Sequence, residues 1–180
     1  MTSRERSELF CTSSLPSGGF EATNGSVSLT PDGVEFGPYA DGGAAGGSLC
    51  YDGFNGRTLS DVSTLIYRAS YGTDDDNAVG VPYLRIFLEG DTHDVIFSPN
   101  TQPIPATAED VVQEWVVHDG TVRYDDDPGN NPDEDWADVK ADHADEAISS
   151  ICVTTGFSAG DNLSALLRSV DINGQRTVFG

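Results

Sequence analysis

The residues that most resemble a catalytic motif are GFSAG at positions 156–160, which match the G-x-S-x-G nucleophile elbow of serine hydrolases. The preceding ISSICVTT is typical of a strand, as an elbow requires. In the α/β-hydrolase order an acid and then a histidine follow the serine, whereas His93, His118 and His143 all precede Ser158. We therefore interpret Ser158 as a turn serine and predict that the chain is not an enzyme. A serine hydrolase acting through Ser158 is the third of three functional hypotheses.

Two acidic segments contain the ligands that a hard cation prefers. Ca²⁺ takes about six to eight oxygen ligands from flexible, carboxylate-rich loops. Neither segment follows the EF-hand spacing, and in so acidic a chain such runs are also expected as solvated surfaces that associate diffusely with Na⁺ or K⁺. The candidate ligands are Asp74, Asp75, Asp76, Asn77, Asp125, Asp126, Asp127 and Asp133. Ca²⁺ is the cation that they would suit, and we expect no required cofactor.

Three aromatic residues could stack on a sugar ring, namely Trp115, Tyr124 and Trp136. Packing in the core or at its rim is the competing interpretation of the two tryptophans. The histidines show neither an H-E-x-x-H motif nor a paired spacing with cysteine, so the sequence gives little support to a transition-metal site.

The charge balance is extreme, with 30 Asp and Glu residues against 9 Lys and Arg residues and a formal net charge of −21. In ordinary salt this charge would oppose compaction and association, whereas multimolar salt shortens the screening length to a few ångströms. Lys140 is the only lysine. Abundant carboxylates with scarce lysine indicate adaptation to high salt. Nucleic-acid binding is excluded, because the sequence has no basic cluster to contact phosphates.

The chain has three cysteines, Cys11, Cys50 and Cys152, so at most one intrachain disulfide can form. Buried free thiols are the expectation, since Cys152 lies in an apolar strand and would behave there as a small hydrophobic residue. Whether Cys11 meets Cys50 is open at this stage. No apolar run approaches the roughly 18 residues of a membrane span. The opening MTSRERSELF is not followed by an apolar core, so no classical secretory signal is expected.

Short β-favouring runs separated by turn residues fill most of the chain. SVSLT and VEF flank Pro31-Asp32-Gly33, and VPYLRIFLEG precedes HDVIFSPN, so each pair is predicted to form a hairpin. WVVH-DG-TVRY, at residues 115–124, is the strongest local signal and predicts a type I′ hairpin at Asp119-Gly120. Asn173-Gly174 predicts another hairpin, which favours a strand over a helix for NLSALLRSV. DVSTLIYRASY has apolar groups on both faces, as a central strand does.

One short helix is predicted over residues 136–147, where Trp136, Val139, His143 and Ala147 share a face. The pattern as a whole predicts an all-β fold, a two-sheet antiparallel β-sandwich of jelly-roll or lectin-like type with one short α-helix near residues 135–147. Residues 1–25 are polar and are interpreted as an N-terminal arm or weak first strand. Residues 26–180 are predicted to form the sandwich domain.

VPYLRIFLEG, VIFSPNTQ, ICVTTGFSAGDN and the ending VDINGQRTVF together resemble a widespread single-domain β-sandwich of secreted and surface proteins of bacteria and archaea. In that group an Asp-containing strand, an NG or GG turn and a final aromatic residue close the domain, as Asp171, Asn173-Gly174 and Phe179 do here. The resemblance covers about residues 60–180 by pattern and implies no catalytic residues. In size, acidity and lack of a signal, the chain also resembles single jelly-roll capsid proteins of viruses that infect halophilic archaea.

The sequence therefore predicts a non-enzymatic structural protein, a jelly-roll subunit of a virion capsid or other surface assembly of a halophile. Its partners would be copies of itself or of other subunits, and residues 1–25 would reach a neighbour and add a strand. Its location would be the virion or an extracellular surface. The alternative hypothesis is a carbohydrate-binding β-sandwich module, whose partner would be a glycan.

Overall fold

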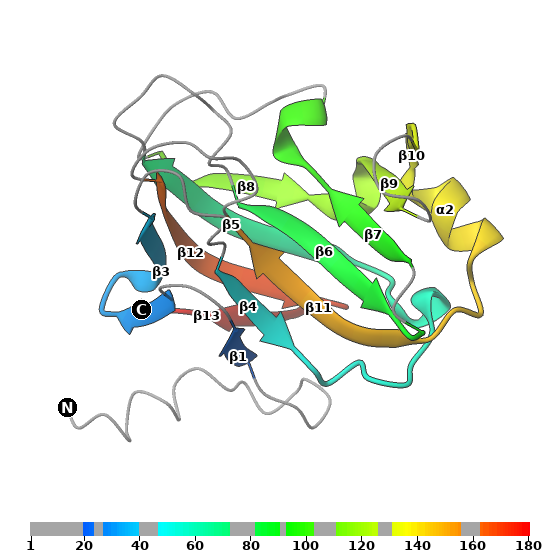
Figure 1. Cartoon of the computed structure of the whole chain (residues 1–180), viewed down its shortest axis with the longest axis horizontal. Helices are drawn as coiled ribbons and strands as arrows, with labels where there is room; N and C mark the ends of the chain where they lie inside the picture. The colour runs from blue at the N-terminus through cyan, green and yellow to red at the C-terminus, as the bar shows by residue number, and fades with distance from the viewer. Residues whose placement is uncertain are drawn as a thin grey trace.

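The computed structural model describes residues 20–23, 27–39, 47–72, 82–90, 93–102, 111–125, 131–155 and 163–180, which form two antiparallel sheets facing each other (Figure 1). The predicted all-β sandwich is confirmed. The larger sheet contains, in spatial order, β1 (Phe20–Thr23), β4 (Ser48–Tyr51), β11 (Ile148–Thr154), β6 (Tyr83–Leu88), β7 (Asp94–Phe97), β9 (Thr121–Asp125) and β10 (Asp133–Asp135). The smaller sheet contains β2 (Val27–Thr30), β3 (Gly33–Tyr39), β12 (Leu163–Ile172), β5 (Leu65–Gly72) and β8 (Gln113–Val116), with β13 (Gln175–Val178) paired to β12.

The strand pairing follows the pattern of an eight-stranded jelly roll. In this fold one long hairpin folds over, so that its first strand pairs with its last and each inner strand pairs with its counterpart. Here β3 pairs with β12, β4 with β11, β5 with β8, and β6 with β7. The folded hairpin then closes laterally through the β12–β5 and β11–β6 pairings. The strands β1, β2, β9, β10 and β13 extend this central set.

The core lies between the sheets because side chains alternate along each strand. In β6, Leu84, Ile86 and Leu88 are buried in the core, and Arg85 and Phe87 lie between them on the opposite face. In β5, Leu65, Tyr67 and Ala69 point inward in the same way. β5 lies between β12 and β8, as expected of a central strand, and its inner face is covered by the core.

Three of the predicted hairpins are confirmed. β2 pairs with β3 next to Pro31 and Asp32, and β6 pairs with β7. β12 pairs with β13 through Asn173 and Gly174, whose φ angles of 55° and 77° are those of a type I′ turn. LSALLRSV, at residues 163–170, accordingly belongs to a strand, as the turn predicted.

The predicted hairpin at Asp119-Gly120 is wrong. β8 pairs with β5 in the smaller sheet and β9 pairs with β7 in the larger one, so the chain crosses between sheets here. A 3₁₀ turn, η4 (Val117–Asp119), makes the crossing, with Val117 fully buried. Gly120 has an extended φ of −105°, unlike the positive φ of a type I′ turn. It is a glycine for a steric reason, because an added Cβ would lie 2.8 Å from a ring carbon of Phe97.

The helix is shorter than predicted, since α2 spans Trp136–Asp142 and His143 is its C-cap. The residues beyond it pair with another segment. The backbone carbonyls of Ala144 and Glu146 accept hydrogen bonds from the amides of Ser60 and Leu59, which lie in or next to η1 (Leu59–Asp61). This pairing competes with the helical ladder and ends the helix. A third 3₁₀ turn, η3 (Pro99–Thr101), follows β7.

Part of the predicted arm belongs to the sandwich, because β1 pairs with β4 at the margin of the larger sheet. The Phe20 ring lies against Tyr51 and Phe179, at centroid distances of 5.0 and 5.1 Å. Phe20 is thus packed against the core, as a weak first strand would be. Residues 1–19 and 24–26 lie outside the described residues.

Candidate functional site

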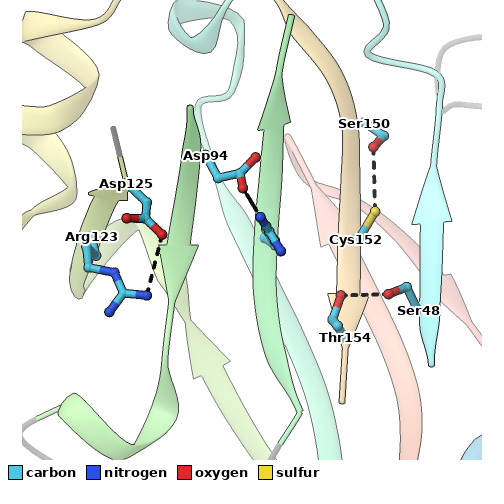
Figure 2. A network of polar contacts seen from close by, with 8 residues as sticks. Ser48, Asp94, Arg123, Asp125, Ser150, Cys152 and Thr154 are labelled. Atoms are coloured by element: carbon cyan, nitrogen blue, oxygen red, sulfur yellow. Dashed lines mark hydrogen bonds and ion pairs between the residues drawn. The ribbon is translucent and has the colours of Figure 1, made fainter. Parts of the chain in front are cut away.

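The outer face of the larger sheet carries a row of buried and half-buried polar side chains that spans β4, β11, β6, β7 and β9 (Figure 2). Alternation places them there, because residues directly opposite each other on neighbouring strands share a face. Cys152 lies opposite Arg85 in the register of β11 and β6, and Thr154 lies opposite Tyr83. At the β4 end, the hydroxyls of Ser48 and Thr154 are 3.1 Å apart and hydrogen-bonded.

Arg85 and Asp94 form the strongest pair of this row. Arg85 Nε donates to Asp94 Oδ2 over 2.7 Å, and its Nη2 donates to the same oxygen. The Asp94 side chain is only 14% exposed, so water screens this pair weakly. The guanidinium also lies over the Phe87 ring, 4.4 Å from its centroid. The pair holds β6 and β7 together on the side away from the core.

Tyr83 completes this cluster. Burial raises the pKa of its hydroxyl well above the ordinary value, and the neighbouring Arg85 opposes that rise only in part. The phenol therefore stays protonated and neutral over the physiological range. It would serve as a hydrogen-bonding group and not as a base.

Of the predicted cation ligands, Asp125 and Asp133 are described, and both neighbour Arg123. Asp125 Oδ2 lies 3.8 Å from Arg123 Nη2, and Asp133 lies opposite Arg123 in the register of β10 and β9. Asp94 lies opposite Asp125 on β7, and two carboxylates in that position repel each other. Arg85 and Arg123 balance them. The positive charge next to Asp94 and Asp125 is thus supplied by arginine side chains.

The other predicted ligands, Asp74, Asp75, Asp76, Asn77, Asp126 and Asp127, lie outside the described residues, as does Ser158. Within the described ranges no group of three or more His, Cys, Asp or Glu side chains is arranged to hold a metal ion.

The cysteines differ from the expected free thiols, because Cys50 and Cys152 form a disulfide. They lie directly opposite each other on β4 and β11, with Cα atoms 4.1 Å apart. This approach is typical of a non-hydrogen-bonded antiparallel pair, in which facing side chains are closest. The disulfide lies on the same outer face as the polar row, with Ser150 Oγ 3.5 Å from Cys152 Sγ.

The three predicted sugar-stacking rings are buried. Trp115, Trp136 and Tyr124 are 5%, 4% and 9% exposed and belong to the core. Trp115 packs against Phe97, at a centroid distance of 6.5 Å. A ring with so little exposed area presents no open face to a sugar in this arrangement, which favours the core-packing interpretation of both tryptophans.

Tyr124 is the centre of a second polar cluster at the C-terminal end of α2. Its hydroxyl donates to both carboxylate oxygens of Glu146, at 2.8 and 3.0 Å, and His143 Nδ1 lies 2.7 Å from Glu146 Oε1. The imidazoles of His143 and His93 stack on the Tyr124 ring, at centroid distances of 3.6 and 5.4 Å. Both oxygens of Glu146 are thereby engaged, and the cluster fixes α2 against β9.

Sequence reasoning missed the Arg85–Asp94 pair and the Tyr124 cluster. The first had a usable signal, because the predicted β6–β7 hairpin and strand alternation together place Arg85 and Asp94 on one outer face. The second had none, since His143 and Glu146 meet Tyr124 only after the helix ends earlier than its pattern predicts.

Neither a protein-family model nor a curated protein matches the chain. In the part of the chain that the structure describes, no helix is long and apolar enough to cross a membrane.

Proposed function

We propose that this protein is a non-enzymatic jelly-roll subunit of a larger structure, a virion capsid or another surface assembly of an organism that lives in high salt. The observation that carries the proposal is the strand order, in which β3-β12-β5-β8 faces β4-β11-β6-β7. A fold hosts many functions, so the surface and the disulfide must support the same conclusion.

The disulfide supports residence outside a reducing compartment. Bonds between cysteines form and persist in secreted proteins and on virion or cell surfaces, and they are rare in the cytosol of most organisms. The Cys50–Cys152 bond joins residues 102 positions apart, so the covalent loop that it closes contains most strands of the jelly roll. A surface or virion location is therefore part of the proposal.

The charge supports assembly in concentrated salt. A net charge of −21 opposes contact between copies in dilute buffer, and screening in strong salt removes that repulsion. The sole lysine has a structural role, because Lys140 Nζ donates to the backbone carbonyl of Val62 at 2.6 Å. The one lysine of the chain thus makes an internal contact, as expected if surface lysines are disfavoured.

The proposed contact between subunits includes strand addition by the N-terminal segment. β1 and β10 are the margins of the larger sheet, and β2 and β8 are margins of the smaller one within the described residues. A margin strand offers unpaired backbone groups to an added strand. Residues 1–19 precede β1, so a truncated variant that lacks them keeps every residue of β1.

The test is the mass of the purified protein in about 2–3 M KCl, where charge is strongly screened. The full chain is compared with a variant lacking residues 1–19, each with and without added Ca²⁺. Large particles formed by the full chain and lost on truncation are expected. Monomers in all four samples would overturn the proposal, and a Ca²⁺ requirement would identify the acidic segments as bridging sites.

A further inference from the structure

The outer face of the smaller sheet carries a patch in which opposite charges balance. One row of the patch crosses four strands and consists of Arg176, Asp171, Ile66 and Val116, each directly opposite the next. The residues that alternate with these along the strands, such as Val170 and Trp115, belong to the core. The row therefore faces away from the core.

A second row runs beside the first and consists of Val178, Ser169, Arg68 and Glu114. Together the two rows form what we call the neutral patch. It contains two arginines and two acids, so its formal charge is zero, in a chain whose net charge is −21. The whole excess of negative charge lies elsewhere.

Ion pairs connect the charges of the neutral patch. Arg68 Nε lies 3.3 Å from Glu114 Oε2, Arg176 Nη2 lies 3.6 Å from the same oxygen, and Arg176 Nε lies 3.8 Å from Asp171 Oδ2. The side chains of Arg68, Glu114 and Arg176 are 42–48% exposed. They are thus partly ordered by their neighbours while remaining accessible to a partner.

Exposed apolar side chains accompany these charges. Val178 is 51% exposed, and Val111 and Val112, which directly precede β8, are 55% and 40% exposed. Leu29 is the only other large hydrophobic residue of the described chain with comparable exposure. Three of the four such residues therefore lie in or next to the neutral patch, at its β13 and β8 ends, where a partner would remove their apolar surface from water.

We infer that the neutral patch is the surface by which two copies of this chain meet about a two-fold axis, an inference that rests on the proposed function. A two-fold contact joins the same surface of both subunits, so that surface must be complementary to itself. Equal numbers of arginines and acids meet that condition, since Arg176 of one copy can face Glu114 of the other and the reverse. A basic partner would instead favour the acidic remainder of the surface. The patch is also where two such acidic chains approach with least repulsion.

Charge reversal with complementation tests this inference. In about 1 M KCl, pairs enclosed by an interface are screened less than exposed ones. Arg176→Glu and Glu114→Arg are each expected to weaken self-association measured by sedimentation velocity by about 100-fold, because like charges then meet across the axis. An equimolar mixture of the two variants restores both opposite-charge contacts and is expected to associate within about 10-fold of the wild type.

An apolar substitution provides the matched control. Val178→Asp is expected to block association, whereas Leu29→Asp, at a site of similar exposure away from the patch, is expected to leave it unchanged. Unaltered near-UV circular dichroism establishes that each variant is folded. If the wild type associates and the three patch variants associate equally well, the inference is overturned while the proposed function stands. If the wild type is a monomer at every salt concentration, both are overturned.

Discussion

Lys140 is a residue whose chemistry and position can be separated experimentally. Its ammonium group donates to the Val62 carbonyl and ties α2 to the end of the sandwich next to η1. Lys140→Met keeps the aliphatic part of the side chain and removes the donor. We expect it to lower the free energy of unfolding by about 1.5–3 kcal/mol, as for a hydrogen bond to a charged group. Urea denaturation at constant KCl measures this difference.

Lys140→Arg is the control, because it keeps a charged donor. It is expected to retain most of the stability. Equal losses in the Lys140→Met and Lys140→Arg variants would show that the packing of the lysine side chain, and not its hydrogen bond, supplies the stability at this position.

Buried tyrosines predict a loss of stability at alkaline pH. Burial raises the pKa of Tyr67 well above its ordinary value, and its hydroxyl donates to the Pro82 carbonyl at 2.7 Å. The pKa of Tyr83 is raised as well, first by burial. The folded state thus holds both protons more tightly than the unfolded state, in which they leave near pH 10. Stability is complete below that pH and falls above it, by up to about 1.4 kcal/mol per pH unit for each tyrosine.

Urea midpoints of unfolding measured from about pH 8 to 11 test this direction, since the unfolded tyrosine titrates within that interval. Tyr67→Phe should reduce the slope above pH 10 while lowering stability at neutral pH through the lost hydrogen bond. A slope identical to that of the wild type would show that Tyr67 ionises as readily in the folded protein as in the unfolded one.

At the scale of elements, local turn chemistry predicted pairing only where both strands stay in one sheet. Asn173-Gly174 has the positive φ values that its sequence indicates, and β12 and β13 pair as expected. Asp119-Gly120 has the same appearance in the sequence, but its glycine is required by a close approach to Phe97 that involves residues distant in the chain. Cys50 and Cys152 illustrate the same limit, because their contact follows from the non-local register of β4 and β11.

The two glycines can be compared by mutation. An added Cβ at Gly120 would lie 2.6 Å from Gln102 Oε1 and 2.8 Å from the Phe97 ring. Gln102 cannot yield easily, since it hydrogen-bonds both backbone groups of Thr121. Gly120→Ala is therefore expected to cost about 1–3 kcal/mol through overpacking. Gly174→Ala meets open space and should cost about 1–2 kcal/mol, through its positive φ alone.

Thermal and urea unfolding of both variants provide the comparison. Gln102→Ala removes the nearest obstructing atom but also two hydrogen bonds, so the cost of Gly120→Ala is measured in the wild-type and in the Gln102→Ala background and is expected to be smaller in the second. The cost of Gly174→Ala should be the same in both backgrounds. An equal cost of Gly120→Ala in both backgrounds would mean that the Phe97 contact alone sets it.

The disulfide acts at the scale of elements, because it joins β4 to β11 near the β1 end of the larger sheet. Replacing both Cys50 and Cys152 by Ala is expected to lower the free energy of unfolding by about 4–5 kcal/mol, the chain-entropy value for a loop of roughly 100 residues. Reduction of the wild type should approach the same value in urea denaturation. Cys11→Ala serves as the control and should leave stability unchanged. A wild type indifferent to reductant would contradict a structural role for this bond.

At the scale of the whole molecule, charge is the property that the sequence predicted most directly, because it depends on composition and not on register. Repulsion among the excess carboxylates should make stability rise with KCl until screening is nearly complete, near about 1 M, where the Debye length is about 3 Å.

Asp142 and Asp145 are exposed at the C-terminal end of α2, where the helix dipole also disfavours negative charge. Asp142→Asn combined with Asp145→Asn is therefore expected to raise stability in dilute salt by about 0.5–2 kcal/mol and to reduce the gain on adding KCl. Urea denaturation of the wild type and the double variant between about 0.1 and 3 M KCl distinguishes charge screening from a general strengthening of apolar burial by salt. The general effect would continue to grow beyond about 1 M and would act equally on the two proteins. A steady rise shared by the variant and the wild type would show that salt stabilises the fold through apolar burial, and that the carboxylates serve solubility alone.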